Sequence, residues 1–364
     1  MIWLLLNISI LTIVYLWPSK NFEIGLDEYN VSKIKRKWIC VVGSVSWIFL
    51  SGLRHVSIGA DTEAYEYLFQ RTAFEDWEYL FTRLTDKFFG GVEDIVDPGF
   101  FIFNKFLSVF IESYQVYLMV FAVIFFISFG RFVYKHSSNP YTSYLLFSCL
   151  FYSFYAITGL RQTLATALVV CFGFKFIKER KLIRFLIVSA IGITIHLSSA
   201  CFIPFYFVSR IKLNKISFAI WWGAIGASFV FRYQFLELMQ SIAGYERYTD
   251  FEGAGAGIFM FLLLAVAGVA TVFYSLLQNE KNEDKLRVYT NAILTACLFV
   301  PLSLINQSLM RIVYYYALFL MFILPELFNM FSKKGDKKVF EIAISMVMIA
   351  LLVMNNPTYK FFWQ

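Results

Sequence analysis

The stretch MIWLLLNISILTIVYLW (residues 1–17) contains no charged side chain and is long enough to cross a bilayer as a helix. A transmembrane helix needs roughly 17 to 25 mostly apolar residues. The stretch has no basic region at its start and no small-residue cleavage site, so we expect a retained membrane helix rather than a signal peptide. It therefore predicts that the chain is held in a membrane.

Apolar runs of this kind recur along the 364 residues, of which 59% are hydrophobic and 20% aromatic. A soluble domain is closer to half apolar. We therefore predict an all-α polytopic integral membrane protein with about 11–12 transmembrane or re-entrant helices, forming a single transmembrane domain over residues 1–364. The candidate spans are residues 1–17, 38–53, 114–130, 141–157, 162–177, 184–196, 197–209, 217–232, 257–277, 289–306, 313–330 and 340–355.

The distribution of basic residues predicts how these spans are oriented. Of the 32 Lys and Arg residues, 22 lie in loops on one side of the predicted membrane and 10 on the other. Cytoplasmic loops are rich in Lys and Arg, so the first side is predicted to be cytoplasmic and both termini extracytoplasmic. The net charge of +7 follows from the same bias, and we expect no nucleic-acid partner.

Segments 184–196 and 197–209 are each too short for an ordinary span. They fit a re-entrant hairpin, two tilted short helices or one long helix. We favour a pair, because one helix would reverse every later span and spoil the charge distribution. His196 lies at the proposed break, in GITIHLSSACFIPF (residues 192–205). A broken helix lines a cavity with polar groups, so His196 is either a functional residue or a hydrogen-bonded structural one.

The longest loop, residues 54–113, is acidic and predicted to be extracytoplasmic, with helices lying at the membrane interface. Arg54, Arg161 and Arg311 each lie at the outer end of a predicted span. Arginine at this depth is costly unless it is paired or functional, and its planar fork suits phosphate. We expect these arginines to hold a lipid-linked phosphate or pyrophosphate; the alternative is contact with ordinary phospholipid headgroups.

Other chemistry is less well supported by the sequence. The five cysteines are scattered through apolar runs, which predicts neither a disulfide framework nor a metal site, and we expect no cofactor. Tyr65 and Tyr315 are either membrane-interface aromatics or platforms for sugar rings. His196 has no acidic neighbour in the sequence, which argues against a membrane acyltransferase with a His–Asp pair.

Four motifs together resemble the EpsG-like branch of the Wzy-type bacterial polysaccharide polymerases. They are Arg54-x4-Gly59-x-Asp61-Thr62-x2-Tyr65-x3-Phe69, GLRQTLATAL, IHLSSACFIPFY and RIVYYY, and the resemblance is best over residues 40–210. Two departures are Ala60, where the family often has Thr, and Asp97 before Pro98-Gly99-Phe100, where it often has Glu. Neither departure removes a charged group.

The resemblance implies a GT-C-like fold and a metal-independent glycosyl transfer at the outer face of the bacterial cytoplasmic membrane. By this resemblance, a growing glycan on undecaprenyl pyrophosphate would pass to the terminal sugar of an incoming lipid-linked repeat unit. Its partners would be undecaprenyl-pyrophosphate-linked oligosaccharides, membrane lipids and a chain-length regulator. The polymer itself, whether capsule, O-antigen or exopolysaccharide, is left open.

The site residues follow as hypotheses. Asp61 and His196 are the catalytic candidates, although Asp61 could instead form a salt bridge with Arg54. Arg54, Arg161 and Arg311 are the pyrophosphate-binding candidates. Secondary candidates are Glu63, Tyr65, Gln162, Arg247 and Tyr315. Two other functions stay open, a lipid-linked glycan ligase and a polysaccharide transporter or flippase.

Overall fold

The computed structural model describes residues 1–17, 28–90, 96–243, 257–276, 283–329 and 334–364. Regular elements within these ranges are helices, and the one β-type contact there is an isolated bridge between Arg54 and Phe361. The chain divides into two compact units, Met1–Leu197 with Ser332–Gln364, and Ser198–Phe331. The prediction of an all-α polytopic membrane protein is confirmed, and the single transmembrane domain stays a prediction.

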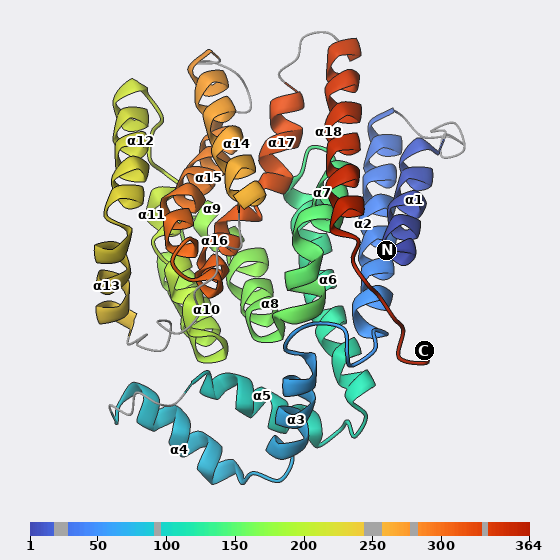
Figure 1. Cartoon of the computed structure of the whole chain (residues 1–364), viewed down its shortest axis with the longest axis vertical. Coiled ribbons are helices and arrows are strands. Elements are labelled where there is room, and N and C mark those ends of the chain that lie inside the picture. Colours follow the sequence, from blue (N-terminus) through green and yellow to red (C-terminus); the bar gives the residue numbers. More distant parts are fainter. Residues whose placement is uncertain (18–27, 91–95, 244–256, 277–282, 330–333) are drawn as a thin grey trace. The chain divides into compact units, whose positions relative to one another are not determined.

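The first unit is a group of long apolar helices with three shorter helices from the acidic loop (Figure 1). Two of its spans contain π-helical turns, named η2 to η4. Its elements are α1 (Ile2–Leu16), α2 (Glu28–Gly52), α3 (Thr62–Thr72), α4 (Trp77–Phe88), α5 (Pro98–Ser108), α6 (Tyr114–His136), α7 (Pro140–Leu146), η2 (Phe147–Phe151), η3 (Ser153–Thr158), α8 (Leu160–Thr166), η4 (Ala167–Phe172), α9 (Phe174–Lys178), α10 (Leu182–Ile195) and α18 (Lys334–Asn355).

Small residues let α2 and α6 pack closely at the centre of this unit. Ser44 of α2 donates a hydrogen bond to the Phe126 carbonyl of α6 at 2.9 Å, and its hydroxyl lies 2.7 Å from that of Tyr144. A Cβ added to Gly130 would lie 2.2 Å from Ser44 Oγ, so no larger residue fits there. Such contacts replace the hydrophobic driving force that is missing between helices in lipid.

The acidic loop contains helices α3, α4 and α5, as predicted (Figure 1). Helix α5 begins with Pro98, whose missing N–H costs nothing in the first turn of a helix. A Cβ on Gly99 would lie 2.2 Å from Thr194 Oγ1, so α5 rests directly against α10 through this glycine. The loop is therefore tied to the membrane helices at the point where α10 ends.

The two termini meet beside the end of α2. The Met1 ammonium donates to the Pro357 carbonyl at 2.6 Å, and the ring centroids of Trp3 and Phe361 lie 4.9 Å apart. The C-terminal segment also bonds to the backbone after α2, where His55 N–H donates to Lys360 O and Phe362 N–H donates to Leu53 O, both at 2.9 Å. Both termini thus lie on one side, as the charge distribution requires; that this side is extracytoplasmic stays a prediction.

The second unit is built of shorter and bent elements. These are η5 (Leu197–Phe202), which begins at the boundary, α11 (Phe205–Val208), α12 (Lys215–Val230), α13 (Arg232–Ala243), α14 (Gly257–Leu276), α15 (Glu283–Ser303), η7 (Gln307–Leu309), α16 (Met310–Ala317) and α17 (Leu320–Phe328). Its core includes Leu236, Leu302 and Ile312. The predicted span 313–330 is a bent pair, α16 and α17, that turns by 47°.

Five helices in the described ranges are long and apolar enough to cross a membrane, or six if the bent pair is one span. Four shorter apolar helices accompany them, including Leu182–Ile195 and Leu197–Val208. His196 lies between these two, with extended backbone at φ −156° and ψ 112°. The prediction of two short segments that break at His196 is confirmed.

Candidate functional site

The break at His196 is held by the carboxylate of Asp97, which precedes α5. The backbone of Asp97 is left-handed, with φ 49° and ψ 51°. Few residues other than glycine adopt this conformation, and the following Pro98 restricts Asp97 further. The Asp97 side chain is 1% exposed. Its unusual backbone directs a carboxylate into the protein instead of into water.

Three donors, one on α8 and two at the break after α10, converge on this carboxylate. Arg161 Nη1 lies 2.9 Å from Asp97 Oδ2, and His196 Nδ1 lies 3.0 Å from the same oxygen. The Leu197 N–H donates to Oδ1 at 3.1 Å. This last bond satisfies a backbone donor that the helix break sets free. Asp97 therefore closes the break and holds His196 and Arg161 side by side.

The environment of Asp97 keeps it ionised. Burial alone would raise the pKa of Asp97, but the His196 hydrogen bond, the charges of His196 and Arg161 and the Leu197 N–H together lower it below its ordinary value. A buried carboxylate with several charge-assisted hydrogen bonds favours its charged form. The pair formed with Arg161 is thus an ion pair over the physiological pH range.

Arg161 is the member of this cluster that reaches the surface. It lies in the first turn of α8, after the turn at Gly159, and its side chain is 28% exposed. Its Nε donates to the Tyr65 hydroxyl at 3.4 Å, and its guanidinium carbon lies 5.7 Å from the Tyr65 ring centroid and 6.0 Å from that of Phe100. These aromatics fix the plane of the guanidinium while one edge remains accessible.

The structure thus brings together three of the residues predicted from sequence, His196, Arg161 and Tyr65. Asp61, which precedes α3, is partly exposed, and its charge acts on Arg161. Glu63 is exposed in the first turn of α3. Asp61 and Glu63 therefore lie on the α3 side of the cluster, toward solvent.

Arg54 lies apart from this cluster, inside the protein. It is fully buried, and its guanidinium donates to the carbonyl oxygens of Ser51 and Ile157, the first at 2.5 Å and the second at 2.9 Å. These acceptors belong to the ends of α2 and η3. The structure therefore uses Arg54 to cap helix ends, and its proposed contact with pyrophosphate stays a prediction, as does the alternative pairing with Asp61.

The remaining predicted residues lie elsewhere. Gln162 is buried next to Arg161 in α8. Tyr315 is buried in the second unit, where its hydroxyl lies 3.1 Å from Ser198 Oγ. Arg311 is partly exposed on α16 of the same unit. Arg247 lies outside the described residues.

Asp97 is the site residue that sequence analysis missed. It stands 99 positions from His196, so proximity in the sequence gives no sign of the pair. His196 has no acidic neighbour in the sequence, but the fold supplies Asp97 as its partner, so the missing neighbour no longer argues against an acyltransferase. One signal was available, because Asp97 precedes the Pro98-Gly99-Phe100 motif that the family resemblance had singled out.

The described residues contain no group of three or more His, Cys, Asp or Glu side chains placed to hold a metal ion. Comparison with known proteins gives one result, a family model described as the EpsG family, which matches residues 37–363. No curated protein and no solved structure matches the chain. The matched segment covers nearly the whole chain, including every member of the Asp97 cluster. This multi-pass membrane protein therefore belongs to the EpsG family, a family of the polysaccharide-polymerase type.

Proposed function

We propose that this protein is a polysaccharide polymerase of the outer face of the bacterial cytoplasmic membrane. It transfers a growing glycan from undecaprenyl pyrophosphate to the terminal sugar of a lipid-linked repeat unit. Family membership supports the polymerase class, and the helices support a site within reach of lipid-borne substrates. The observation that carries the specific proposal is the cluster of Asp97, His196 and Arg161 at a helix break.

The cluster supplies the two groups that the reaction needs. His196 donates its Nδ1 proton to Asp97, which leaves Nε2 as the proton acceptor. Arg161 presents an accessible guanidinium, whose Nη2 makes no hydrogen bond within the described residues. A guanidinium matches the geometry of phosphate oxygens and carries a charge at every pH of interest. Asp97 orients both groups and is a positioning residue.

The proposed step is a displacement at the anomeric carbon of the donor glycan. The acceptor hydroxyl oxygen bonds to this carbon, the bond from the carbon to the pyrophosphate oxygen breaks, and undecaprenyl pyrophosphate leaves with the bonding electrons. His196 Nε2 takes the hydroxyl proton as general base. Arg161 stabilises the negative charge that develops on the pyrophosphate, which in a low-dielectric site is a large contribution. No metal is needed for this step.

Asp61 is a second candidate for the base, because it belongs to the family motif and lies on the solvent side of Arg161. In that case His196 would position Asp97 and the helix break. Arg311 is proposed as a second arginine that donates hydrogen bonds to the phosphate. Substitutions of Asp61 and His196 separate the two roles, because only loss of the residue that acts as the base affects the proton-transfer step.

Replacement of Arg161 tests the proposal most directly. Purified protein supplied with lipid-linked repeat units should make a ladder of polymer, and Arg161→Glu should reduce the rate by about 100-fold or more. Arg161→Lys should retain part of the rate, because lysine keeps the positive charge but cannot form the bidentate hydrogen bonds that a guanidinium makes to phosphate. Arg71→Glu is the matched control, since Arg71 lies on α3 with a 58% exposed side chain paired to Glu75.

Polymer of normal length and rate from Arg161→Glu protein would overturn the proposal, as would equal losses in Arg161→Glu and Arg71→Glu. If Arg161→Glu fails to fold, His196→Gln gives the second test, with loss of rate and unchanged substrate binding expected. The product also separates the rival functions. A ligase would attach preformed polymer to a different acceptor, and a flippase would make no new glycosidic bond.

A further inference from the structure

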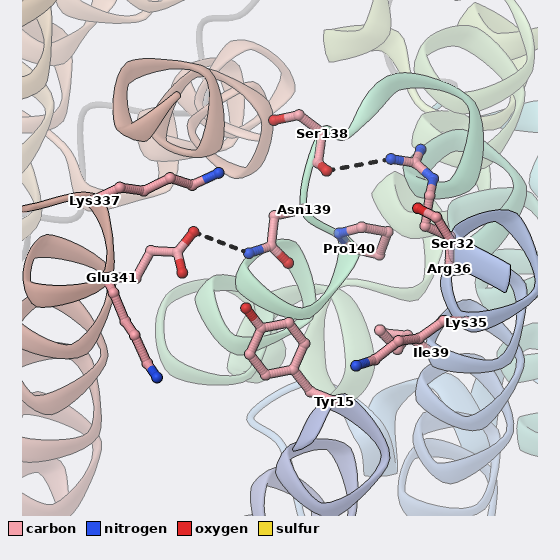
Figure 2. Close-up of a pocket in the computed structure, with 11 residues that line it drawn as sticks. Tyr15, Ser32, Lys35, Arg36, Ile39, Ser138, Asn139, Pro140, Lys337 and Glu341 are labelled. Carbon is pink, nitrogen blue, oxygen red and sulfur yellow. Dashed lines mark hydrogen bonds between the residues drawn. The ribbon is translucent and has the colours of Figure 1, made fainter. Parts of the chain in front are cut away.

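A second polar site lies in the first unit, between α1, the start of α2, the turn from α6 to α7 and the start of α18 (Figure 2). It is a cavity of about 390 Å³. Lys35 and Gly52 are 17 residues apart on α2, so at roughly 1.5 Å per residue the cavity is about 25 Å from the helix end beside Arg54. We call it the basic pocket, defined by Lys35, Arg36, Asn139, Lys337, Lys338 and Glu341.

Positive charge dominates the basic pocket. Four cationic side chains line it, Lys35, Arg36, Lys337 and Lys338, and Glu341 is the one carboxylate among the lining residues. Figure 2 shows Lys35 and Lys337 extending from opposite sides into the space between the helices. Like charges this close repel one another, so an anion between them would be bound favourably.

The contacts within the pocket do not cancel its excess of positive charge, because four cationic side chains face one carboxylate. Arg36 donates to the carbonyl oxygens of Tyr134 and Ser137 at 2.9 and 2.8 Å, which neutralises the partial negative charge at the end of α6 but leaves a formal positive charge. Glu341 accepts from Asn139 Nδ2 at 3.3 Å. Lys35 has a 3.4 Å contact to the Trp17 carbonyl, and burial lowers its pKa, so its ammonium gains from an anionic neighbour.

We propose that the basic pocket binds a phosphate-bearing anion on the side of the membrane opposite to the end of α2 beside Arg54. Its volume lies in the range of small-molecule sites, roughly 300 to 1,000 Å³. Lysine binds phosphate as a point charge, and basic pockets between membrane helices on the cytoplasmic side suit anionic headgroups. Phospholipid headgroups and soluble phosphate compounds share this chemistry, and the proposal does not depend on the polymerase assignment.

Thermal stabilisation of the purified full-length chain in a non-ionic detergent measures such binding, because a ligand of the folded state raises its melting temperature. The probes are dihexanoyl phosphatidylglycerol, dihexanoyl phosphatidylcholine and inorganic pyrophosphate. Stabilisation by phosphatidylglycerol alone indicates a lipid headgroup, and stabilisation by pyrophosphate indicates a soluble anion. Stabilisation by none of them, or equal stabilisation by the two lipids, would overturn the proposal.

Variants assign the effect to the pocket. The double variant Lys35→Gln/Lys338→Gln should weaken binding by roughly fivefold per lysine removed. The control, Lys212→Gln/Lys215→Gln, removes two exposed lysines from the same predicted side and should bind normally. Binding should also persist in Arg161→Gln, which separates the pocket from the Asp97 cluster. Equal weakening in the two double variants would show a general charge effect and refute the proposal.

Glu341→Gln provides a test with the opposite sign. It removes the carboxylate that repels an anion, while the amide oxygen can still accept from Asn139. Binding should therefore tighten by several-fold, which loss of folding cannot mimic. Weaker or unchanged binding in this variant would count against an anion site.

Discussion

At the scale of single residues, Asp97 combines a strained backbone with a carboxylate whose two oxygens both accept hydrogen bonds. A non-glycine residue in the left-handed region costs about 1 to 3 kcal/mol, and such strain persists where the surroundings fix it. Here the surroundings are Arg161, His196 and the Leu197 N–H. The contacts that orient His196 as the proposed base and Arg161 as the proposed phosphate-binding residue therefore also hold Asp97 in place.

The variant Asp97→Asn should show how much the negative charge of Asp97 contributes to the stability of the protein. We expect a loss of about 2 to 3 kcal/mol in stability at pH 7, because the charge-assisted hydrogen bonds to the buried side chain are weakened and Arg161 loses its counter-ion. Folding lowers the pKa of Asp97, so its contribution is complete above the ordinary Asp pKa and is lost as pH falls through the lowered value. The difference in melting temperature should be constant from pH 7 to about pH 5 and shrink below about pH 4.

Asp76→Asn is the control, since Asp76 also precedes a helix of the acidic loop but is exposed. It should change the melting temperature little at any pH. If the Asp97→Asn difference instead grew on acidification, the charge of Asp97 would not stabilise the fold. Activity gives a separate readout, because Asp97→Asn should lower the polymerisation rate more than substrate binding.

The chemistry of the site was predictable only in part. Arg161 and His196 were identifiable because a charged or polar residue at membrane depth is costly and demands a reason. The Pro98-Gly99-Phe100 motif drew attention to Asp97, but its pairing with them was not predictable, because only the tertiary fold places α5 against α10. Arg54 carried the same signal as Arg161, yet it donates to backbone carbonyls. A sequence pattern cannot separate an arginine that binds phosphate from one that caps helices.

At the scale of elements, the turn before α3 depends on Gly59. Its φ is 105°, and an added Cβ would lie 2.6 Å from Thr62 Oγ1 and 2.8 Å from a methyl carbon of Ile157. Gly59→Ala should therefore cost about 1 to 3 kcal/mol, from backbone strain and from the displaced neighbours. Melting temperature in detergent measures this loss.

Gly223→Ala is the matched control for that substitution. Gly223 lies within α12, and an added Cβ there would meet no atom within 4 Å. The control should leave the melting temperature unchanged or slightly raised, because alanine favours a helix. Equal destabilisation by both substitutions would refute the role assigned to the Gly59 turn.

Helix positions were predictable because apolar length is a strong signal, and every predicted span overlaps a helix. The break at His196 was also predictable, since two short runs on either side of it could not each be an ordinary span. The π-helical turns η2, η3 and η4 were not, because these short segments lie inside apolar runs that read as ordinary α-helical spans. The bend between α16 and α17 was not predicted either, because residues 313–330 are long enough to read as a single span.

At the scale of the whole molecule, the first unit joins the two ends of the chain. Phe361 is buried between Trp3 and Trp363, with ring centroids at 4.9 and 4.4 Å. Phe361→Ala should cost about 3 kcal/mol, the lower end for a buried aromatic because the site lies at the edge of the protein. Phe362→Ala is the control, as Phe362 is 47% exposed. A similar loss in both variants would show that the segment does not dock through Phe361.

The contact between the Tyr359 hydroxyl and the Leu50 carbonyl joins positions 309 residues apart. A ribosome adds about 5 to 20 residues per second, so the end of α2 waits at least about 15 seconds for this partner. During that interval the backbone groups beyond Gly52 must be satisfied by water, headgroups or a chaperone. Quality control that samples nascent membrane proteins would therefore find the end of α2 without this partner until Tyr359 has been synthesised.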